Sequence, residues 1–158
     1  MFEEIAILGP GLLGASLIQA LKRNRLVKRA VAWSRRPETR VKCSQQPWCD
    51  AVYPTPSEAV AHADLVVACI PVEHIVPLLE EVAAALQPGA IVTDVGSTKS
   101  LITRHAHAAM PSGVHFVGAH PMAGSEKTGL EHAFPELFEN RACLVTPLPE
   151  TDAAALEK

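Results

Sequence analysis

The stretch Ile5-Ala6-Ile7-Leu8-Gly9-Pro10-Gly11-Leu12-Leu13-Gly14 sets the fold of this chain. Its four leading apolar residues are typical of a strand buried on both faces, and the glycines that follow are spaced Gly-x-Gly-x-x-Gly. From Leu12 to about Asn24 apolar residues return at helical spacing. The helix face that we expect to pack carries Leu13, Leu17, Ala20 and Leu21. The stretch therefore predicts a buried strand, a tight turn and an amphipathic helix.

The glycine turn has the context that phosphate binding requires, because it lies between a strand and a helix. In that setting Gly9 permits the tight turn, Gly11 lets a pyrophosphate approach the backbone, and Gly14 lets the helix pack closely on the strand. The helix N-terminus adds N–H donors and a partial positive charge. We expect a dinucleotide to bind over Gly9, Gly11, Leu12, Leu13 and Gly14. The alternative is a glycine-rich turn without a ligand.

The rest of the chain alternates short apolar runs with amphipathic stretches, which is typical of a parallel sheet covered by helices on both faces. Further strands are predicted at residues 30–33, 50–53, 65–70, 90–93, 114–117 and 142–146, with the strand at 65–70 in the centre. Helices are predicted at 37–46, 75–86 and 99–109, with a short one capped by Ser57, a weakly helical patch at 135–138 and a loop at 118–129. The fold class is α/β, a doubly wound, mostly parallel Rossmann-type sheet.

The composition narrows the class of partner. The chain has 158 residues, of which 20% are charged, and a formal net charge of −3, so it lacks the basic field that would hold nucleic acid or an anionic membrane. It has no basic leader segment and no apolar run near the ~20 residues that span a bilayer, so we expect a cytoplasmic protein. We interpret the scattered cysteines as buried apolar residues rather than metal or disulfide ligands; they are Cys43, Cys49, Cys69 and Cys143.

Three further segments contribute to the predicted cofactor site. A carboxylate that would bind a ribose 2′-hydroxyl is expected about 20 residues after the glycines, and the chain has Ser34-Arg35-Arg36 there instead. A serine and two arginines accept a 2′-phosphate, which favours NADP over NAD, although the arginines could simply be a solvated cap on the next helix. Ile70-Pro71-Val72 and Asp94 follow later strands, at the sheet edge where ligands of open α/β sheets bind.

Two polar segments follow strands without being needed for packing. They are Asp94-Val95-Gly96-Ser97-Thr98-Lys99-Ser100 and the segment Gly118-Ala119-His120-Pro121-Met122-Ala123-Gly124-Ser125-Glu126-Lys127-Thr128-Gly129. Together with the glycine turn, these strings resemble the prephenate and arogenate dehydrogenases of tyrosine biosynthesis, whose patterns D-x-x-S-x-K and H-P-M-x-G-x-E-x-x-G stand at these places. The resemblance covers nearly the whole chain.

The resemblance implies NAD(P)-dependent oxidation of prephenate or arogenate with loss of CO2. The hydroxyl proton must go to a base, and a histidine suits that role because its side chain titrates near neutrality. His120 would be this base, and Ser97 would hydrogen-bond near it and the substrate, or else simply cap the following helix. Lys99 would attract a substrate carboxylate or face solvent, and Glu126 and Thr128 would border the substrate. The remaining histidines show no metal-ligand spacing, and no metal is expected.

The resemblance also implies a second, helical dimerisation domain, so the full-length enzyme would be a homodimer. Residues 1–150 would then be the dinucleotide-binding domain and residues 151–158 the start of a linking helix, in a chain that binds NADP but turns over substrate poorly. A β-hydroxyacid dehydrogenase is the nearest rival, and the His-Pro-Met string argues against it. A stand-alone NADP-binding or redox-sensing module is a rival of a different class.

Overall fold

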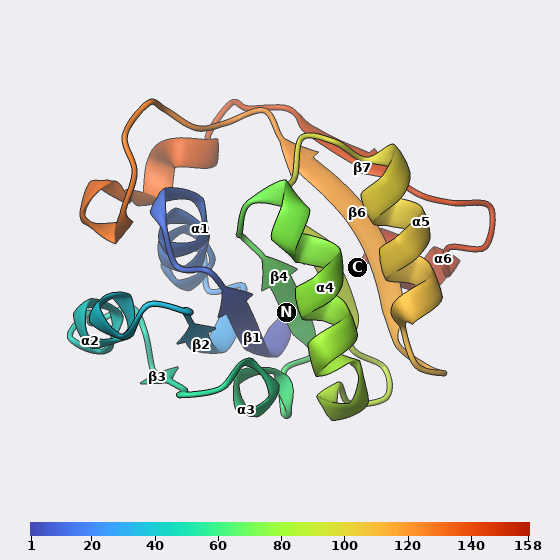
Figure 1. Ribbon diagram of the computed structural model, residues 1–158. Helices are drawn as coiled ribbons and strands as arrows, with labels where there is room; N and C mark the ends of the chain where they lie inside the picture. Colours follow the sequence, from blue (N-terminus) through green and yellow to red (C-terminus); the bar gives the residue numbers. More distant parts are fainter.

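The computed structural model describes residues 1–158 and contains one seven-stranded sheet in the order β3-β2-β1-β4-β5-β6-β7 (Figure 1). All neighbouring strands are parallel except β6 and β7. The strands are β1 (Phe2–Leu8), β2 (Val27–Trp33), β3 (Ala51–Val52), β4 (Leu65–Ala68), β5 (Ile91–Asp94), β6 (His115–Pro121) and β7 (Cys143–Thr146). The Rossmann-type fold is confirmed, with β4 at the centre of the sheet as predicted.

Helices cover both faces of the sheet (Figure 1). The α-helices are α1 (Leu12–Arg23), α2 (Pro37–Ser44), α3 (Pro56–Val60), α4 (Val72–Val82), α5 (Ser100–Ala109) and α6 (Ala153–Glu157). Three 3-10 helices complete the set: η1 (Ala83–Ala85), η2 (Leu130–His132) and η3 (Pro135–Phe138). None of the helices combines the length and the apolar composition that crossing a membrane requires.

The apolar character of β1 follows from its burial between two cores. Ala6 and Leu8 join the larger cluster, with α3, α4 and α5, whereas Ile5 and Ile7 join a second cluster with Ile18 of α1. Side chains of a strand alternate between faces, so a strand covered on both sides has to be apolar throughout. This packing holds the end of β1, and therefore the glycine turn, rigidly against the first turn of α1.

The packed face of α1 differs from the predicted one. Ala15 and Ile18 are fully buried, while the predicted residues Leu13, Leu17, Ala20 and Leu21 are half-buried at its flanks. The reason is that α1 also packs against η2 and η3, where the Phe134 N–H donates to the Ser16 hydroxyl at 3.1 Å. A helix with neighbours on two sides buries a different stripe from one that lies on a sheet alone.

Three further predictions of local structure were wrong. The N-cap of α3 is Thr55 rather than Ser57, because Thr55 and Glu58 form a reciprocal capping box. The region predicted as a loop from Gly118 onward continues as strand to Pro121, because β7 returns antiparallel and pairs with it. Since β7 is an edge strand, its Cys143 is exposed, contrary to the prediction of burial, whereas Cys43 is buried as expected.

The last helix begins where the sequence predicted. The Asp152 carboxylate caps α6 by accepting the Ala155 N–H at 2.8 Å. Ala155 is buried against Ile91 and Val117, so α6 packs on the sheet face opposite α4 and α5.

Candidate functional site

The three glycines of the turn have three different environments. Gly9 has a φ of +101°, and a Cβ on it would lie 2.6 Å from the Cys69 carbonyl oxygen. A Cβ on Gly14 would lie 2.6 Å from the Gly9 carbonyl oxygen, whereas a Cβ on Gly11 would meet nothing within 4 Å. Gly9 therefore shapes the turn, Gly14 permits close packing of α1, and Gly11 presents bare backbone to open space, as predicted.

The N-terminus of α1 fits an anionic group. Gly11 is the N-cap, its residue type offers no capping side chain, and the first turn contains no acidic residue. The first N–H groups of a helix have no acceptor within the helix, and they carry the positive end of its dipole. Bare backbone at Gly11 lets a pyrophosphate reach these donors, so the turn fits the dinucleotide that the sequence implied.

The turn opens into a cleft of about 670 Å³. Its walls include most of the predicted cofactor residues, namely Gly9, Gly11, Ser34, Arg35, Arg36, Ile70 and Pro71, but not Leu12, Leu13, Gly14 or Val72. The cleft also takes in Thr128, which was predicted to border the substrate. It leaves out the predicted cofactor residue Asp94 and the predicted catalytic and substrate residues Ser97, Lys99, His120 and Glu126. Sequence reasoning missed Lys42 and His74, whose place on the walls depends on how α2 and α4 face each other.

The end of β2 shapes one side of this cleft. Ser34 is buried, its hydroxyl accepts the Arg36 N–H at 3.3 Å, and its carbonyl accepts from the Arg40 guanidinium at 2.6 Å. These bonds hold the turn between β2 and α2 while the side chains of Arg35 and Arg36 stay exposed. Two guanidinium groups therefore lie at the end of β2, where a carboxylate would repel a phosphate. Glu38 also lines the cleft.

Asp94 lies at the end of β5 with its side chain fully buried. Its carboxylate accepts the Gly96 N–H at 2.9 Å and the Ala119 N–H at 3.3 Å, and it forms an ion pair with Lys99. Lys99 also donates to the Ala119 carbonyl at 2.9 Å, and its side chain is 14% exposed. The Asp94 side chain is therefore enclosed, and its oxygens are occupied by protein donors.

The two candidate catalytic residues lie near the ends of neighbouring strands. Ser97 is exposed in the turn after β5, and the N-cap of α5 is Lys99, so the alternative of Ser97 as the helix cap is wrong. His120 is half-buried on β6, opposite Leu144 of β7. Ser97 and His120 form no hydrogen bond with each other in the structure. Both lie at the carboxyl-terminal edge of the sheet, which also carries the glycine turn.

Cys69 closes the end of β4 beneath the glycine turn and lines the cleft. Burial, together with the charge of Asp94, raises the pKa of the Cys69 thiol to about 12. The thiol therefore stays protonated at neutral pH, and the residue acts as an inert apolar part of the cleft floor. No group of three His, Cys, Asp or Glu side chains is placed to hold a metal ion.

Comparison with known proteins agrees with these observations. Residues 17–158 match the model of the nucleotide-binding domain of prephenate dehydrogenase. The chain is 36% identical to the prephenate dehydrogenase of Bacillus subtilis strain 168, over 100% of this chain and 43% of that protein. It spans between 41% and 53% of the length of the curated relatives that it matches.

Solved structures show the same fold. A prephenate dehydrogenase of A. aeolicus in complex with hydroxyphenyl propionate and NAD+ superposes with a TM-score of 0.91 at 26% identity, over 99% of this chain and 55% of that one. An arogenate dehydrogenase of Synechocystis gives a TM-score of 0.89 at 34% identity, over 98% of this chain and 53% of that one.

Proposed function

Because this chain belongs to the prephenate dehydrogenase family, through its nucleotide-binding domain, we propose that it binds NADP for the oxidative decarboxylation of prephenate or arogenate. Membership of this family sets aside the β-hydroxyacid dehydrogenase alternative. The observation that carries the proposal is the cleft over Gly11, which shares the carboxyl-terminal edge of the sheet with His120.

The geometry of the sheet relates the two parts of this site. From β1, which ends in the glycine turn, to β6, which carries His120, there are three strand spacings, or about 14 Å. A dinucleotide whose pyrophosphate lies over α1 extends along this edge and brings its nicotinamide end toward β5 and β6. The pyrophosphate and the base are thus separated by a span that suits one extended ligand.

In the proposed reaction the bound nicotinamide supplies a hydride acceptor for the carbinol carbon of the substrate. His120 accepts the hydroxyl proton as the carbon–oxygen double bond forms. Loss of CO2 then makes the ring aromatic, so the protein's main task is to orient the alcohol between the base and the hydride acceptor. Ser97, exposed in the turn after β5, is proposed to hydrogen-bond the substrate hydroxyl.

The preference for NADP rests on the end of β2. Arg35 and Arg36 are exposed on the cleft wall, and the buried Ser34 replaces an acid at the end of β2. A 2′-phosphate therefore meets two guanidinium donors at this position, with Glu38 also on the cleft wall. Calorimetry with NADP+ and NAD+ tests this on the 158-residue chain. We expect Arg35→Ala and Arg36→Ala each to weaken NADP+ binding about tenfold, as loss of a charge-assisted bond would, and to leave NAD+ binding almost unchanged.

Arg141→Ala is the matched control, because Arg141 is exposed and lies outside the cleft. It should bind both dinucleotides like the parent chain. Tighter binding of NAD+ than NADP+ by the parent chain would reverse the assignment of Ser34, Arg35 and Arg36.

Turnover is a separate test. NADPH formation is followed with prephenate and with arogenate, for the parent chain and for His120→Asn. We expect slow turnover of at least one substrate and a loss of about 100-fold or more in the variant, within the range that general-base catalysis contributes. Tight NADP+ binding without turnover of either substrate would instead support a stand-alone binding module.

A further inference from the structure

The ion pair of Asp94 and Lys99 is more deeply buried than any other in the molecule, and the proposed chemistry gives it no task. The exposed fractions of the two side chains are 0% and 14%, whereas every other ion pair has at least one side chain exposed by 38% or more. Removing charges from water is costly and has to be repaid by good geometry and further hydrogen bonds. The pair therefore requires an explanation beyond surface electrostatics.

Apart from the Gly96 N–H, which donates to Asp94 at 2.9 Å, the further hydrogen bonds concern one residue of β6. The N–H of Ala119 donates to Asp94 at 3.3 Å, and the carbonyl of Ala119 accepts from Lys99 at 2.9 Å. That carbonyl belongs to the peptide bond that joins Ala119 to His120. The ion pair thus holds both polar backbone groups of the residue immediately before the proposed base.

This contact begins where the backbone ladder stops. The pairing of β5 with β6 ends at Thr93 and Val117, whereas β6 continues to Pro121. Beyond Val117 the other neighbour of β6 is β7, an edge strand whose Leu144 and Val145 are 53% and 47% exposed. Without the ion pair, the segment that carries His120 would be held mainly by an exposed edge strand.

We propose that Asp94 and Lys99 are positioning residues that clamp the Ala119–His120 peptide to β5 and so fix the direction of the His120 imidazole. The effect of this clamp on catalysis rests on the proposed function, in which His120 is the base. The structure gives Lys99 a different task from binding a substrate carboxylate, because its ammonium group already has an anion and a carbonyl as partners. A base displaced by about 1 Å can lose about 100-fold in rate.

The clamp itself is tested without catalysis, on the 158-residue chain. In Asp94→Ala/Lys99→Met both contacts are lost but no unpaired charge remains, so this variant should fold even if a single variant does not. We expect hydrogen exchange at the Ala119 amide to accelerate at least about tenfold, while exchange at Ile7 in the centre of β1 stays unchanged. The ring signals of His120 in NMR spectra should shift or broaden as the imidazole gains freedom.

Lys28→Met is the matched control, because it removes a lysine from an exposed ion pair with Glu3 at the opposite end of the sheet. Its exchange pattern around Ala119 should equal that of the parent chain. Unchanged exchange at Ala119 and unchanged His120 signals in the double variant would overturn the clamp.

The kinetic consequence is tested by the split between kcat and KM. We expect Lys99→Met to lower kcat about 100-fold with the KM for substrate within about twofold, and Lys99→Arg to recover much of the loss, since a guanidinium can still meet both acceptors. A raised KM with unchanged kcat would instead make Lys99 a substrate ligand. If His120→Asn proved fully active, the proposed function would fail, while the exchange measurements would still decide whether the clamp exists.

Discussion

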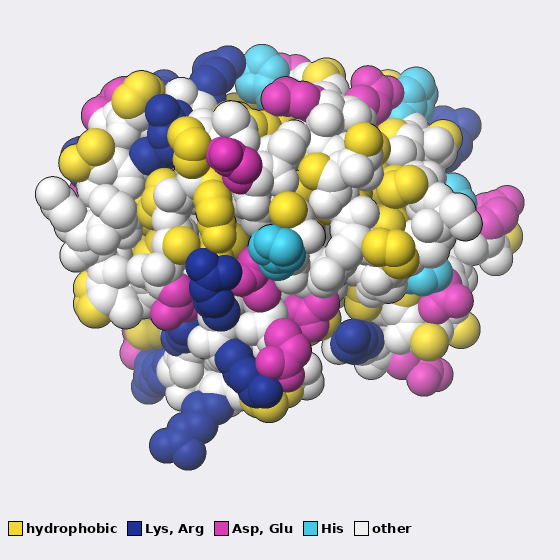
Figure 2. Space-filling view, turned by 90° about the horizontal axis from the view of Figure 1, so that it is seen from below, with side chains coloured by type: hydrophobic (Ala, Val, Ile, Leu, Met, Phe, Trp, Pro, Cys, Tyr) yellow, Lys and Arg dark blue, Asp and Glu magenta, His cyan; other side chains and the backbone are white.

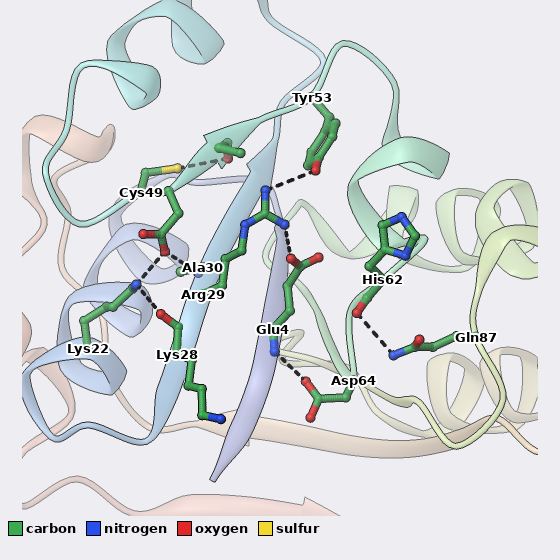
Figure 3. A network of polar contacts seen from close by, with 12 residues as sticks. Glu4, Lys22, Lys28, Arg29, Ala30, Cys49, Tyr53, His62, Asp64 and Gln87 are labelled. Atoms are coloured by element: carbon green, nitrogen blue, oxygen red, sulfur yellow. Dashed lines mark hydrogen bonds and ion pairs between the residues drawn. The ribbon is translucent and has the colours of Figure 1, made fainter.

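The two ends of the sheet use their polar groups differently. At the amino-terminal end, carboxylates accept backbone N–H groups and pair with lysine and arginine side chains. At the carboxyl-terminal end, backbone donors and arginines face an open cleft. Asp64 accepts the N–H group of Glu4 at 2.9 Å (Figure 3). It also accepts the N–H group of Glu3 at 3.0 Å. Asp50 accepts the Ala30 N–H at 2.6 Å and pairs with Lys22 at 2.5 Å. The polar groups of the amino-terminal end thus satisfy one another.

The outer surface shows the same balance. Figure 2 looks onto the side of the molecule that carries β3 and α3, and acidic and basic side chains are interleaved there rather than gathered by sign. Such a surface has no strong field of either sign to attract a charged ligand. The charged side chains that line the cleft are also mixed, with Arg35, Arg36 and Lys42 against Glu38, Glu81 and Glu131. The cleft differs because it also holds the N-terminus of α1, whose backbone donors have no partner within the helix.

The difference shows what makes one end of a parallel sheet a binding site. Both ends contain charged residues, but only the carboxyl-terminal end has helix N-termini and turns whose donors are left for a ligand. The buried carboxylate at this end, Asp94, is neutralised by Lys99 and enclosed by protein donors, so it does not repel an anion. Changes at the cleft should therefore affect binding, and changes at the opposite end should affect stability alone.

The largest effect is expected from Gly9→Ala. The added Cβ would overlap the Cys69 carbonyl at 2.6 Å, and alanine at a φ of +101° is strained. Together these should lower the free energy of unfolding by about 3 kcal/mol, or about 10 °C in Tm, and also abolish dinucleotide binding. Thermal denaturation and calorimetry measure the two effects. A variant of normal stability would mean that the turn rearranges freely.

Gly11→Ala should separate binding from folding. Because nothing lies within 4 Å of the added Cβ, stability should change by no more than about 0.5 kcal/mol. The methyl group would stand where the pyrophosphate approaches, so NADP+ affinity should fall about 30-fold, or about 2 kcal/mol. Gly89 lies outside the cleft, and Gly89→Ala is the control for binding alone, because alanine at its φ of +86° is strained and lowers stability. Normal NADP+ affinity in Gly11→Ala would place the phosphates elsewhere.

How far the sequence predicted this molecule depends on the range of the interactions. The strands, the order of the elements and the spacing of Gly9, Gly11 and Gly14 are local signals, because they lie within short stretches of sequence. The close contact of Gly9 with the Cys69 carbonyl at the end of β4 is not local, although the motif still located the glycine. The packed face of α1 was mispredicted since η2 and η3, more than 100 residues away, cover its second side.

The candidate site was predictable only in part, for the same reason. Sequence motifs located Ser34, Arg35, Arg36 and His120 on turns and strand ends, but Lys42 and His74 enter the cleft through the packing of α2 and α4. The bonds of Asp94 and Lys99 with Ala119 depend on β6 extending past the end of β5, which follows from its pairing with β7. No periodicity or spacing in the sequence reports that register.

A smaller effect on stability is expected at the amino-terminal end from Asp64→Ala. The Glu3 and Glu4 N–H groups lose their acceptor there, but water can reach the exposed one, so the cost should be about 1 kcal/mol. Urea denaturation measures this loss, and calorimetry should find NADP+ affinity unchanged. A weaker affinity for NADP+ would show that the two ends of the sheet are energetically coupled, whereas we expect them to act independently.

The smallest effect should come from Asp50, and it should depend on pH. Burial acts to raise the pKa of Asp50, but the hydrogen bonds from Lys22 and the Ala30 N–H outweigh it, so the pKa lies below its ordinary value of 3.8. A lowered pKa in the folded state stabilises the protein above the unfolded value, and this contribution is lost as the pH falls through the folded value. Because Asp50 is 38% exposed, the contribution should be only about 0.5 kcal/mol.

Asp50→Asn should therefore be slightly less stable than the parent chain at about pH 6, and the difference should vanish as the pH falls through the lowered pKa of the folded state, where the carboxylate itself becomes protonated. Urea denaturation across this range measures it, with Glu150→Gln as the control, since Glu150 is exposed and forms no ion pair. A difference that persisted unchanged at low pH would mean that Asp50 acts through packing. The carboxylates of the amino-terminal end would then stabilise the sheet by shape rather than by charge, and the contrast between its two ends would lie in their backbone donors alone.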